Sequence, residues 1–307
     1  MAEKRLRKNK DIITKIVSYT ILAVGGFIML YPFIYCFLGS LLTLEEYLNA
    51  GLLPLPKDLN IKRFANLLKF FDHEDVWSSI AITLARFGFY SFTNIFFSMI
   101  GGYIFAKVKF KGKTFVFYYM MISMMVPGVA TMYPGFLMYA KWPLIGGNNI
   151  LGQGGTGFIG NWSVMFIGGW FGAYNMFLVR QSIYDIGNEI GEAAEIDGAS
   201  TMRVILGIYL PLLRAVMAVI VIGLFIGMWN DYLFPMTFML GTNTPHLIPI
   251  GYKVFDIISR AEGNSSQLPN YPAIFGVCFT AMLPTILCFA LLQKHFVEGM
   301  AMGAVKG

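Results

Sequence analysis

Charged side chains are scarce in this sequence. Only 13% of its 307 residues are Asp, Glu, Lys or Arg, whereas 56% are hydrophobic and the mean hydropathy is +0.62. A soluble globular domain carries about 25% charged residues. The composition therefore excludes an ordinary soluble globule and indicates an integral membrane protein.

Cysteine and histidine are also scarce, with three residues of each type. An odd number of cysteines within apolar runs does not suit a disulfide framework, so we expect small packing or lipid-facing residues there. The histidines are dispersed, which excludes a zinc triad and haem ligation within a helix bundle. No metal site is predicted from Cys36, Cys278, Cys288, His73, His246 and His295.

Motifs for nucleotide binding and catalysis are missing. The glycine-rich segment 146–155 has no Lys at the spacing of a phosphate-binding loop, and Gly112-Lys113-Thr114 lacks the upstream glycine. We find no nucleophile, acid pair or metal cluster. The net charge of +6 comes from basic residues beside apolar runs, so nucleic acid is not an expected partner. We therefore expect no catalytic residue and no bound cofactor, and any ATP hydrolysis must occur on another chain.

Six apolar runs reach the length of about 20 residues that a helix needs to cross a bilayer. The predicted fold class is an all-α integral membrane protein with six transmembrane helices. Prolines inside these runs predict kinks at Pro32, Pro127, Pro134 and Pro284. The runs lie near 16–40, 80–106, 115–140, 158–180, 210–235 and 272–293.

The positive charges indicate the orientation of these spans. With a cytoplasmic N-terminus, the cytoplasmic segments hold fifteen Lys or Arg and the longer outer loops hold seven, so both termini are predicted in the cytoplasm. The first run is too long for a signal peptide and is expected to be retained. The predicted organisation is a basic N-terminus at 1–15, a first helix at 16–40, an outer loop at 41–79, a core of five helices at 80–295 with a cytoplasmic loop at 181–211, and a tail at 296–307.

Two outer segments have distinct patterns. The first, about 43–76, contains an apolar pattern that predicts an amphipathic helix. We interpret this helix as a lid lying on the bilayer, and its apolar residues are Phe64, Leu67, Leu68, Phe70 and Phe71. The second, 142–160, is rich in Gly and Asn, so we expect it to be either mobile or tightly folded back.

The most charged segment between two apolar runs covers residues 192–211. Ala and Glu predict a helix that starts near Asn188, and Gly198 predicts its end in a left-handed turn. Ser200 can cap a second short helix that reaches about Gly207. The pattern predicts a helix, a tight turn and a helix outside the membrane, which either docks on a partner or packs on this protein's own spans.

Glu192-Ala193-Ala194, Asp197-Gly198-Ala199 and then Leu210-Pro211 resemble the conserved cytoplasmic loop of ABC-importer permeases. The ending Gly-Ala-Val-Lys-Gly resembles the carbohydrate-uptake permeases of the maltose-transporter type, in particular the shorter six-span partner of the heterodimer. The resemblance implies the type I ABC importer permease fold, with this loop as a coupling helix seated in a cleft of the ATPase. The implied coupling residues are Glu192, Ala193, Ala194, Ile196, Asp197, Gly198, Ala199, Ile208, Leu210 and Pro211.

The resemblance also implies partners in the plasma membrane of a prokaryote. These are a second, non-identical permease, two ABC ATPase subunits that bind ATP and Mg²⁺, an extracellular or periplasmic solute-binding protein, membrane lipid and a sugar substrate. Closure of the ATPases would push on the loop and rock the spans between inward-facing and outward-facing states.

The fifth apolar run ends in Trp229-Asn230-Asp231, where a carboxylate is costly unless it faces water, a partner or the protein interior. Asp231 is either an interfacial residue beside an aromatic belt or, as the resemblance implies, an outer-gate residue. Arg86 is expected to snorkel outward. A group of aromatic and amide side chains in the fourth and fifth runs either lines a sugar pathway or fills the helix bundle. The group consists of Trp170, Tyr174, Asn175, Trp229 and Asn230.

The polar outer segment 241–271 corresponds in maltose-type permeases to a loop that reaches into the solute-binding protein. The implied contact residues are Thr242, Asn243, Thr244, Asn264 and Gln267. Other functions stay open: an ABC permease for a non-sugar solute, an ion-driven secondary carrier, and a membrane enzyme or scaffold.

Overall fold

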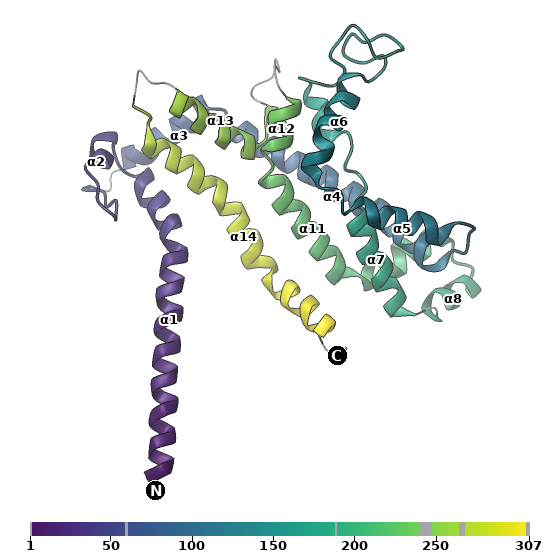
Figure 1. Ribbon diagram of the computed structural model, residues 1–307, viewed down its shortest axis with the longest axis horizontal. Coiled ribbons are helices and arrows are strands. Elements are labelled where there is room, and N and C mark those ends of the chain that lie inside the picture. The colour runs from purple at the N-terminus through teal and green to yellow at the C-terminus, as the bar shows by residue number, and fades with distance from the viewer. Residues whose placement is uncertain (1, 59–60, 188, 240–246, 264–267, 305–307) are drawn as a thin grey trace. The chain divides into compact units, whose positions relative to one another are not determined.

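The computed structural model describes residues 2–58, 61–187, 189–239, 247–263 and 268–304, and these residues form helices and loops without a strand. The all-α class predicted from the sequence is confirmed. The chain divides into two compact units, whose elements appear in Figure 1. Unit 1 combines Met1–Glu74 with Ile257–Met282, and unit 2 combines Asp75–Asp256 with Leu283–Gly307.

Unit 1 contains the predicted amphipathic helix, α3, packed on α14 through a glycine. Phe71 of α3 is only 2% exposed, and a Cβ on Gly276 of α14 would lie 2.2 Å from Cδ1 of Leu67. A larger residue than glycine at this contact would require the Leu67 side chain to move. The elements of unit 1 are α1 (Ala2–Ser40), α2 (Leu44–Leu48), α3 (Ile61–His73), the end of α13 (Ile250–Gly263) and the start of α14 (Tyr271–Ala304).

In the part of the chain that the structure describes, three helices are long and apolar enough to cross a membrane: Ile12–Ser40 within α1, Val76–Lys107 (α4) and Tyr271–Leu291 within α14. These three helices coincide with the predicted spans 16–40, 80–106 and 272–293, and their crossing of the membrane stays a prediction. Two bent helix pairs raise the number of candidate spans among the described residues to five, if each pair is one span.

The bent pairs fall on the third and fifth predicted spans. α5 (Lys113–Ser123) and α6 (Gly128–Ala140) meet at 101°, after Pro127, which is the N-cap of α6. The kink expected at Pro127 is thus a complete break, because the residue before a proline disfavours helical backbone. Thr201–Leu212 and α11 (Arg214–Trp229) meet at 82°. The other prolines in predicted spans lie inside helices, at Pro32, Pro134 and Pro284.

The predicted fourth span, 158–180, is not one continuous helix, and the expectation of a single helix there is wrong. The segment holds a 3-10 helix, η1 (Trp162–Phe166), then a non-helical stretch, and only then α7 (Ala173–Ile186). Gly168 and Gly169 have φ angles of +80° and +67°. Left-handed backbone at two successive glycines interrupts the helix, which an average of hydropathy over the segment does not detect.

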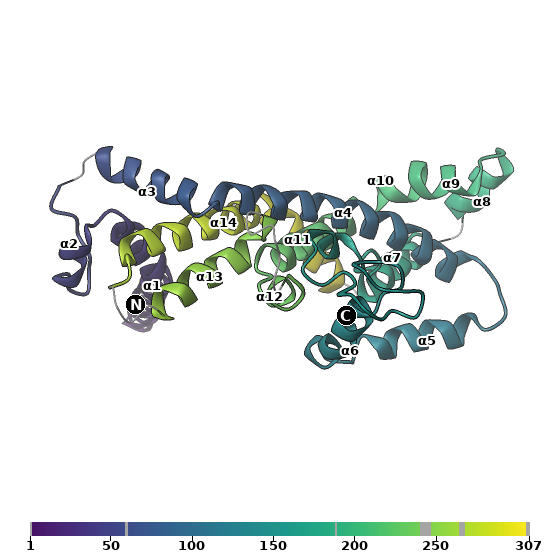
Figure 2. The ribbon, with the colours of Figure 1, turned by 90° about the horizontal axis from the view of Figure 1, so that it is seen from above.

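Unit 2 is organised around α4, which packs against α7 and α11. Two glycines allow α7 to approach: a Cβ on Gly102 would lie 2.5 Å from Cγ1 of Val179, and one on Gly101 would lie 3.1 Å from Cγ of Met176. Small residues at such contacts let membrane helices pack closely. Figure 2 shows α8 (Glu189–Ile196), α9 (Thr201–Val204) and α10 (Leu210–Leu212) grouped at one end of this unit.

The Gly- and Asn-rich segment 142–160 is tightly folded, which is one of the two outcomes expected. Asn148 Nδ2 donates to the carbonyls of Ala140 and Trp142 at 2.8 and 3.0 Å, and its Oδ1 accepts from the Gly155 N–H at 2.9 Å. A Cβ on Gly157 would lie 2.1 Å from the Tyr139 carbonyl oxygen. Asparagine therefore closes the segment, and glycine lets its backbone approach α6.

Candidate functional site

The first candidate site is the α8–α10 segment (residues 189–212), which folds as the predicted helix, turn and helix. α8 ends in a Schellman motif: Gly198 has a φ of +77°, and the Ala199 N–H donates to the Ala194 carbonyl at 2.9 Å. Glycine adopts left-handed backbone at the lowest cost. One glycine and its neighbouring backbone bonds therefore specify the turn locally.

The second helix starts at Ser200, whose Oγ accepts a hydrogen bond from the Arg203 N–H at 3.4 Å. α9 continues into a π-helix, η2 (Ile205–Tyr209), and then into α10. Within it the Leu210 N–H donates to the Ile205 carbonyl, five residues earlier. The helix expected to reach about Gly207 therefore extends to Leu212, with a wider turn in its middle.

Some of the predicted coupling residues pack inside the chain. Ala194 is 9% exposed, and Ala199, Ile208 and Leu210 pack on the same core, which also holds Tyr209. Ala194 therefore faces the core and not the outward docking surface expected of it, and Ala199 is half-buried beside it. They stabilise the turn, because the Schellman motif is accompanied by an apolar contact between these two positions.

The remaining coupling residues are exposed. Ile196, at the end of α8, is 87% exposed, which is unusual for a large apolar side chain next to a turn. Contact with an ATPase stays a prediction for the exposed group, which comprises Glu192, Ala193, Ile196, Asp197, Gly198 and Pro211.

The sequence predicts that Glu192 and Asp197 fix this segment through capping or polar contacts. Within the described part of the chain, neither side chain makes a hydrogen bond or an ion pair. Apolar packing holds the segment instead: a Cβ on Gly191 of α8 would lie 2.9 Å from the hydroxyl of Tyr209. The two carboxylates are therefore available at the surface.

The second candidate site is a buried ion pair between α4 and the segment that follows α11. Arg86 Nη1 lies 2.8 Å from Asp231 Oδ2, and the two side chains are 4% and 19% exposed. The prediction that Arg86 snorkels outward is wrong, because its guanidinium is neutralised inside the protein. Ionisable residues buried in membrane proteins are paired in this way and mark functional positions.

Aromatic rings and a helix end surround the Arg86–Asp231 pair. Arg86 Cζ lies 5.7 Å from the ring centre of Tyr90 and 5.4 Å from that of Phe234. Asp231 Oδ1 accepts from the Phe234 N–H at 3.2 Å, in the first turn of α12 (Leu233–Phe238). Among the described residues, Arg86 Nε is buried without a hydrogen-bond partner. The pair therefore ties α4 to α12 while leaving one donor unsatisfied.

One predicted pathway residue, Asn175, joins a polar contact that the sequence analysis missed. Asn175 Nδ2 donates to Asn94 Oδ1 at 3.1 Å, and Asn94 Nδ2 donates to the Gly169 carbonyl at 2.7 Å. Asn94 shares one face of α4 with Thr83, Arg86 and Tyr90, because these residues are spaced by three or four. This spacing of three or four residues could have indicated from the sequence that Asn94 belongs to the same polar face.

The other predicted pathway residues are not brought together. Trp170 and Tyr174 are 44% and 54% exposed, whereas Trp229 is 3% exposed and its ring centre lies 5.4 Å from that of Phe225. Asn230 is exposed and donates to the Ile226 carbonyl at 2.9 Å. The expected binding-protein contacts lie outside the described residues: Thr242, Asn243, Thr244, Asn264 and Gln267.

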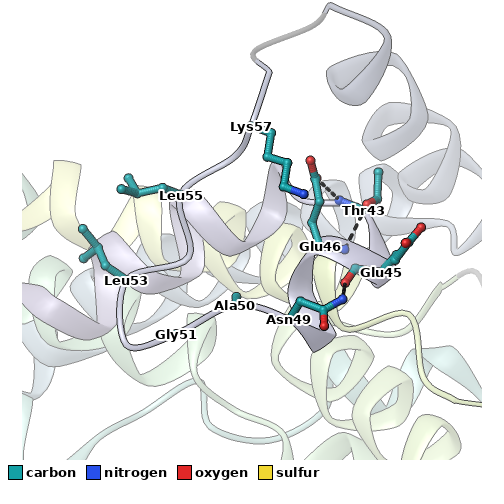
Figure 3. A pocket seen from close by; sticks show the side chains of 9 residues that line it. All are labelled: Thr43, Glu45, Glu46, Asn49, Ala50, Gly51, Leu53, Leu55 and Lys57. Carbon is teal, nitrogen blue, oxygen red and sulfur yellow. Dashed lines mark hydrogen bonds between the residues drawn. The ribbon is translucent and has the colours of Figure 1, made fainter.

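Unit 1 has a polar cavity of about 550 Å³ beside α2, drawn in Figure 3. Thr43 and Glu46 form a capping box at the start of α2, with bonds of 2.9 and 3.2 Å. Arg63 also binds Glu46 with both terminal nitrogens, at 2.6 and 3.0 Å. These bonds from Arg63, followed by those from Thr43, lower the pKa of Glu46 to about 2.

The fold and the first site define an all-helical protein with several helices long and apolar enough to cross a bilayer and with an exposed short helix–turn–helix. Residues 95–302 match the family described as "Binding-protein-dependent transport system inner membrane component". The chain belongs to this family, as its resemblance to ABC-importer permeases predicts.

Curated relatives match over nearly their whole length. The "Lactose transport system permease protein LacG" of Rhizobium radiobacter is 25% identical, over 95% of this chain and 96% of the relative. The "Arabinooligosaccharides transport system permease protein AraQ" of Bacillus subtilis is 27% identical, over 91% of each chain. These relatives are named as permease proteins of transport systems.

A solved structure shares the fold. It is the "Crystal structure of a bacterial ABC transporter involved in the import of the acidic polysaccharide alginate", matched with a TM-score of 0.73 over 94% of this chain and 98% of that chain. The identity is 22%, so the match is evidence about the fold alone.

Proposed function

We propose that this chain is a permease subunit of an ATP-driven, binding-protein-dependent importer for a sugar, most simply an oligosaccharide. It pairs with a second, non-identical permease, receives the sugar from a solute-binding protein and contacts two ATPase subunits, which bind ATP and Mg²⁺. The chain itself catalyses no reaction. With six crossings, the fourth of them interrupted at Gly168 and Gly169, and with both termini in the cytoplasm, the α8–α10 segment would lie on the side of the ATPases.

The observation that carries the proposal is the exposed tip of the α8–α10 segment. Its inner face packs on the core that includes Val179 and Ile183 of α7, while Ile196 is 87% exposed. A rigid segment with an exposed apolar tip suits docking in a cleft of another protein. Because α7 packs on α4, a push on the tip is transmitted to the membrane helices.

The sugar class is supported by the names of the relatives, which include lactose, arabinooligosaccharides, melibiose, raffinose and stachyose. A second candidate is an ABC permease for another small solute. It is favoured by a further relative, the "sn-glycerol-3-phosphate transport system permease protein UgpE" of Brucella suis, which is 25% identical over 94% of this chain. An ion-driven carrier is a third alternative, which would work without an ATPase and without a solute-binding protein.

The experiment is purification of the full chain from its native membranes in mild detergent, with mass-spectrometric identification of stoichiometric partners. We expect a second permease and an ABC ATPase with the wild type. Ile196→Asp should lose the ATPase and retain the second permease, because a carboxylate would be desolvated in the docking cleft.

The matched control is Ile150→Asp. Ile150 is 74% exposed in the segment 142–160, which the proposal places on the outer side. This variant should retain both partners. Recovery of the wild-type chain alone, or only with copies of itself, would overturn the proposal; uptake that survives ATP depletion and fails on loss of the membrane potential would favour the carrier.

A further inference from the structure

A cavity of about 630 Å³ lies where α4, α5, α7 and α8 converge in unit 2. α4, the loop after it and the start of α5 contribute one lysine each, and α8 contributes the only carboxylate of the lining. The lining residues are Tyr103, Ala106, Lys107, Lys109, Lys113, Tyr184, Gly187, Gly191, Glu192 and Tyr209. We call this space the lysine cavity.

Backbone carbonyls hold two of the three ammonium groups. Lys113 Nζ donates to the carbonyls of Val108 and Ala106 at 3.0 and 3.3 Å, and Lys107 Nζ donates to the carbonyl of Gly187. These carbonyls carry no net charge, so they orient the two ammonium groups without cancelling their charge. The cavity therefore has three positive charges in its lining against one negative charge from Glu192.

The helix that starts at the cavity adds to the positive potential. α5 begins with Lys113, after Gly112, which has a φ of +82° and provides no side-chain cap. The first N–H groups of a helix and its dipole favour an anion. A compact anion with several acceptor oxygens, such as a phosphate group, matches this surrounding set of donors.

Apolar side chains adjoin the lysines at the end of the α4 span. Ile104, Val108 and Phe110 are 37%, 41% and 40% exposed, and the last two alternate along the chain with Lys107, Lys109 and Lys111. Since α4 is a candidate membrane span that ends at Lys107, these side chains lie at the level where acyl chains meet headgroups. The expected ligand therefore combines a phosphate with an apolar tail.

We infer that the lysine cavity binds the phosphate headgroup of an anionic phospholipid. Lys107, Lys109 and Lys113 hold the phosphate, and the acyl chains lie against Val108 and Phe110. Basic pockets between membrane helices bind anionic headgroups in this manner. Because Gly191 and Glu192 line the same cavity, a bound headgroup also contacts α8. This consequence for coupling rests on the proposed function, whereas headgroup binding does not.

The experiment uses the full chain with its copurifying partners, delipidated in detergent and titrated with phosphatidylglycerol under native mass spectrometry. Lys109→Gln/Lys113→Gln should weaken binding about 30-fold, because each lysine near the headgroup contributes roughly fivefold to affinity. The matched control is Lys111→Gln, which removes an exposed lysine of the same loop that does not line the cavity. It should change affinity less than about twofold.

A variant that is expected to strengthen lipid binding distinguishes a change in affinity from damage to the fold. Glu192→Gln removes the carboxylate from the lining and should tighten phosphatidylglycerol binding about fivefold. A misfolded protein would not gain affinity. An effect of Lys111→Gln equal to that of the double variant, or no gain with Glu192→Gln, would overturn the inference.

Two further titrations identify the source of the phosphate. Phosphatidylcholine has the same phosphate without net charge and should bind at least tenfold more weakly than phosphatidylglycerol. Inorganic phosphate alone should not displace the bound lipid at equal concentration; displacement would overturn the lipid in favour of a soluble phosphate. These measurements need neither ATP nor sugar, so a failed transport assay leaves them unaffected.

Discussion

The two candidate sites of unit 2 use charge in opposite ways. In the α8–α10 segment the carboxylates of Glu192 and Asp197 are exposed, and a glycine turn with apolar packing fixes the backbone. At the other site the charges of Arg86 and Asp231 are buried, and the ion pair itself joins two elements. Only at the second site does the structure depend on the charges.

The difference follows from the surroundings of each group. An exposed carboxylate keeps its hydration and contributes little to stability unless a partner arrives. A buried guanidinium has lost its hydration, so removal of its partner leaves an uncompensated charge. Charge at the first site is therefore available for recognition, and charge at the second site constrains the conformation.

The largest effect is expected from breaking the buried pair. Asp231→Asn or Arg86→Met should lower the free energy of unfolding by about 3–5 kcal/mol, because each leaves one buried charge unpaired. The double variant should recover most of this loss, since no charge remains. The measurement is denaturant-induced unfolding of the purified full chain in detergent micelles.

The control for this pair is Glu192→Gln/Asp197→Asn, which should change the free energy of unfolding by less than about 0.5 kcal/mol. Additive losses in the Arg86→Met/Asp231→Asn double variant would contradict a direct interaction between the two residues.

The next effect tests the packing on which both sites depend. Gly102→Ala places a Cβ 2.5 Å from Val179 Cγ1 and should cost about 1–3 kcal/mol of stability. Gly88→Ala is the matched control on the same helix, because a Cβ there meets nothing within 4 Å. The same unfolding assay compares the two variants, and equal stability would show that α4 and α7 are not in close contact.

A smaller effect on stability, but a large one on uptake, is expected at the turn. Gly198→Asp should cost about 1–2 kcal/mol for left-handed backbone and should leave folding and insertion intact. The added carboxylate at the exposed tip should uncouple sugar uptake from ATP hydrolysis. Gly198→Asn, which also tolerates this backbone without adding charge, should retain more uptake. Full uptake by Gly198→Asp, measured in cells with an equal amount of inserted protein, would contradict the coupling role.

The smallest effect concerns the ion pair of Glu46 with Arg63 in unit 1. Its side chains are less buried than the Arg86 side chain and less exposed than the carboxylates of the α8–α10 segment. The pKa of Glu46 is lowered from 4.5 to about 2, so the pair with Arg63 contributes fully above pH 4.5. The contribution should fall as the pH drops from 4.5 towards 2. Limited proteolysis of the segment 41–60 should accelerate over this range, and Glu46→Gln should abolish the dependence. A pH dependence that survives in Glu46→Gln would assign it to another group.

The sequence predicted the parts of the fold that local chemistry specifies. Gly198 and Ser200 marked the ends of α8 and the start of α9, because capping depends on residues only a few positions apart. The bond from Arg86 to Asp231 spans 145 residues, so no local pattern could indicate it. The expectation that Arg86 snorkels failed because its partner lies far along the chain, in the segment between α11 and α12.

The errors in the spans have a similar origin. Hydropathy detected segments 115–140 and 158–180 but did not register the break at Pro127 or the left-handed pair Gly168 and Gly169. The sequence also could not predict which alanine of α8 is buried, because Ala193 and Ala194 are identical in chemistry and differ only in the face of the helix that they occupy. Only the three-dimensional packing assigns Ala194 to the core.

The π-helix at Ile205–Tyr209 makes this region sensitive to its residue count rather than to its composition. One residue more than an α-helical turn is accommodated between Ile205 and Leu210. Deleting a single residue there would restore α-helical winding and leave the flanking residues on their present faces, because the wide turn is what accommodates the extra residue. Deleting a second residue would have no wide turn to compensate for it and would rotate everything upstream by about 100° relative to α10. The apolar face of α8 and α9 would then turn off the core, although every type of side chain in the segment were still present. Phase along the helix is thus as much a determinant of where Ile196 points as any contact that Ile196 makes.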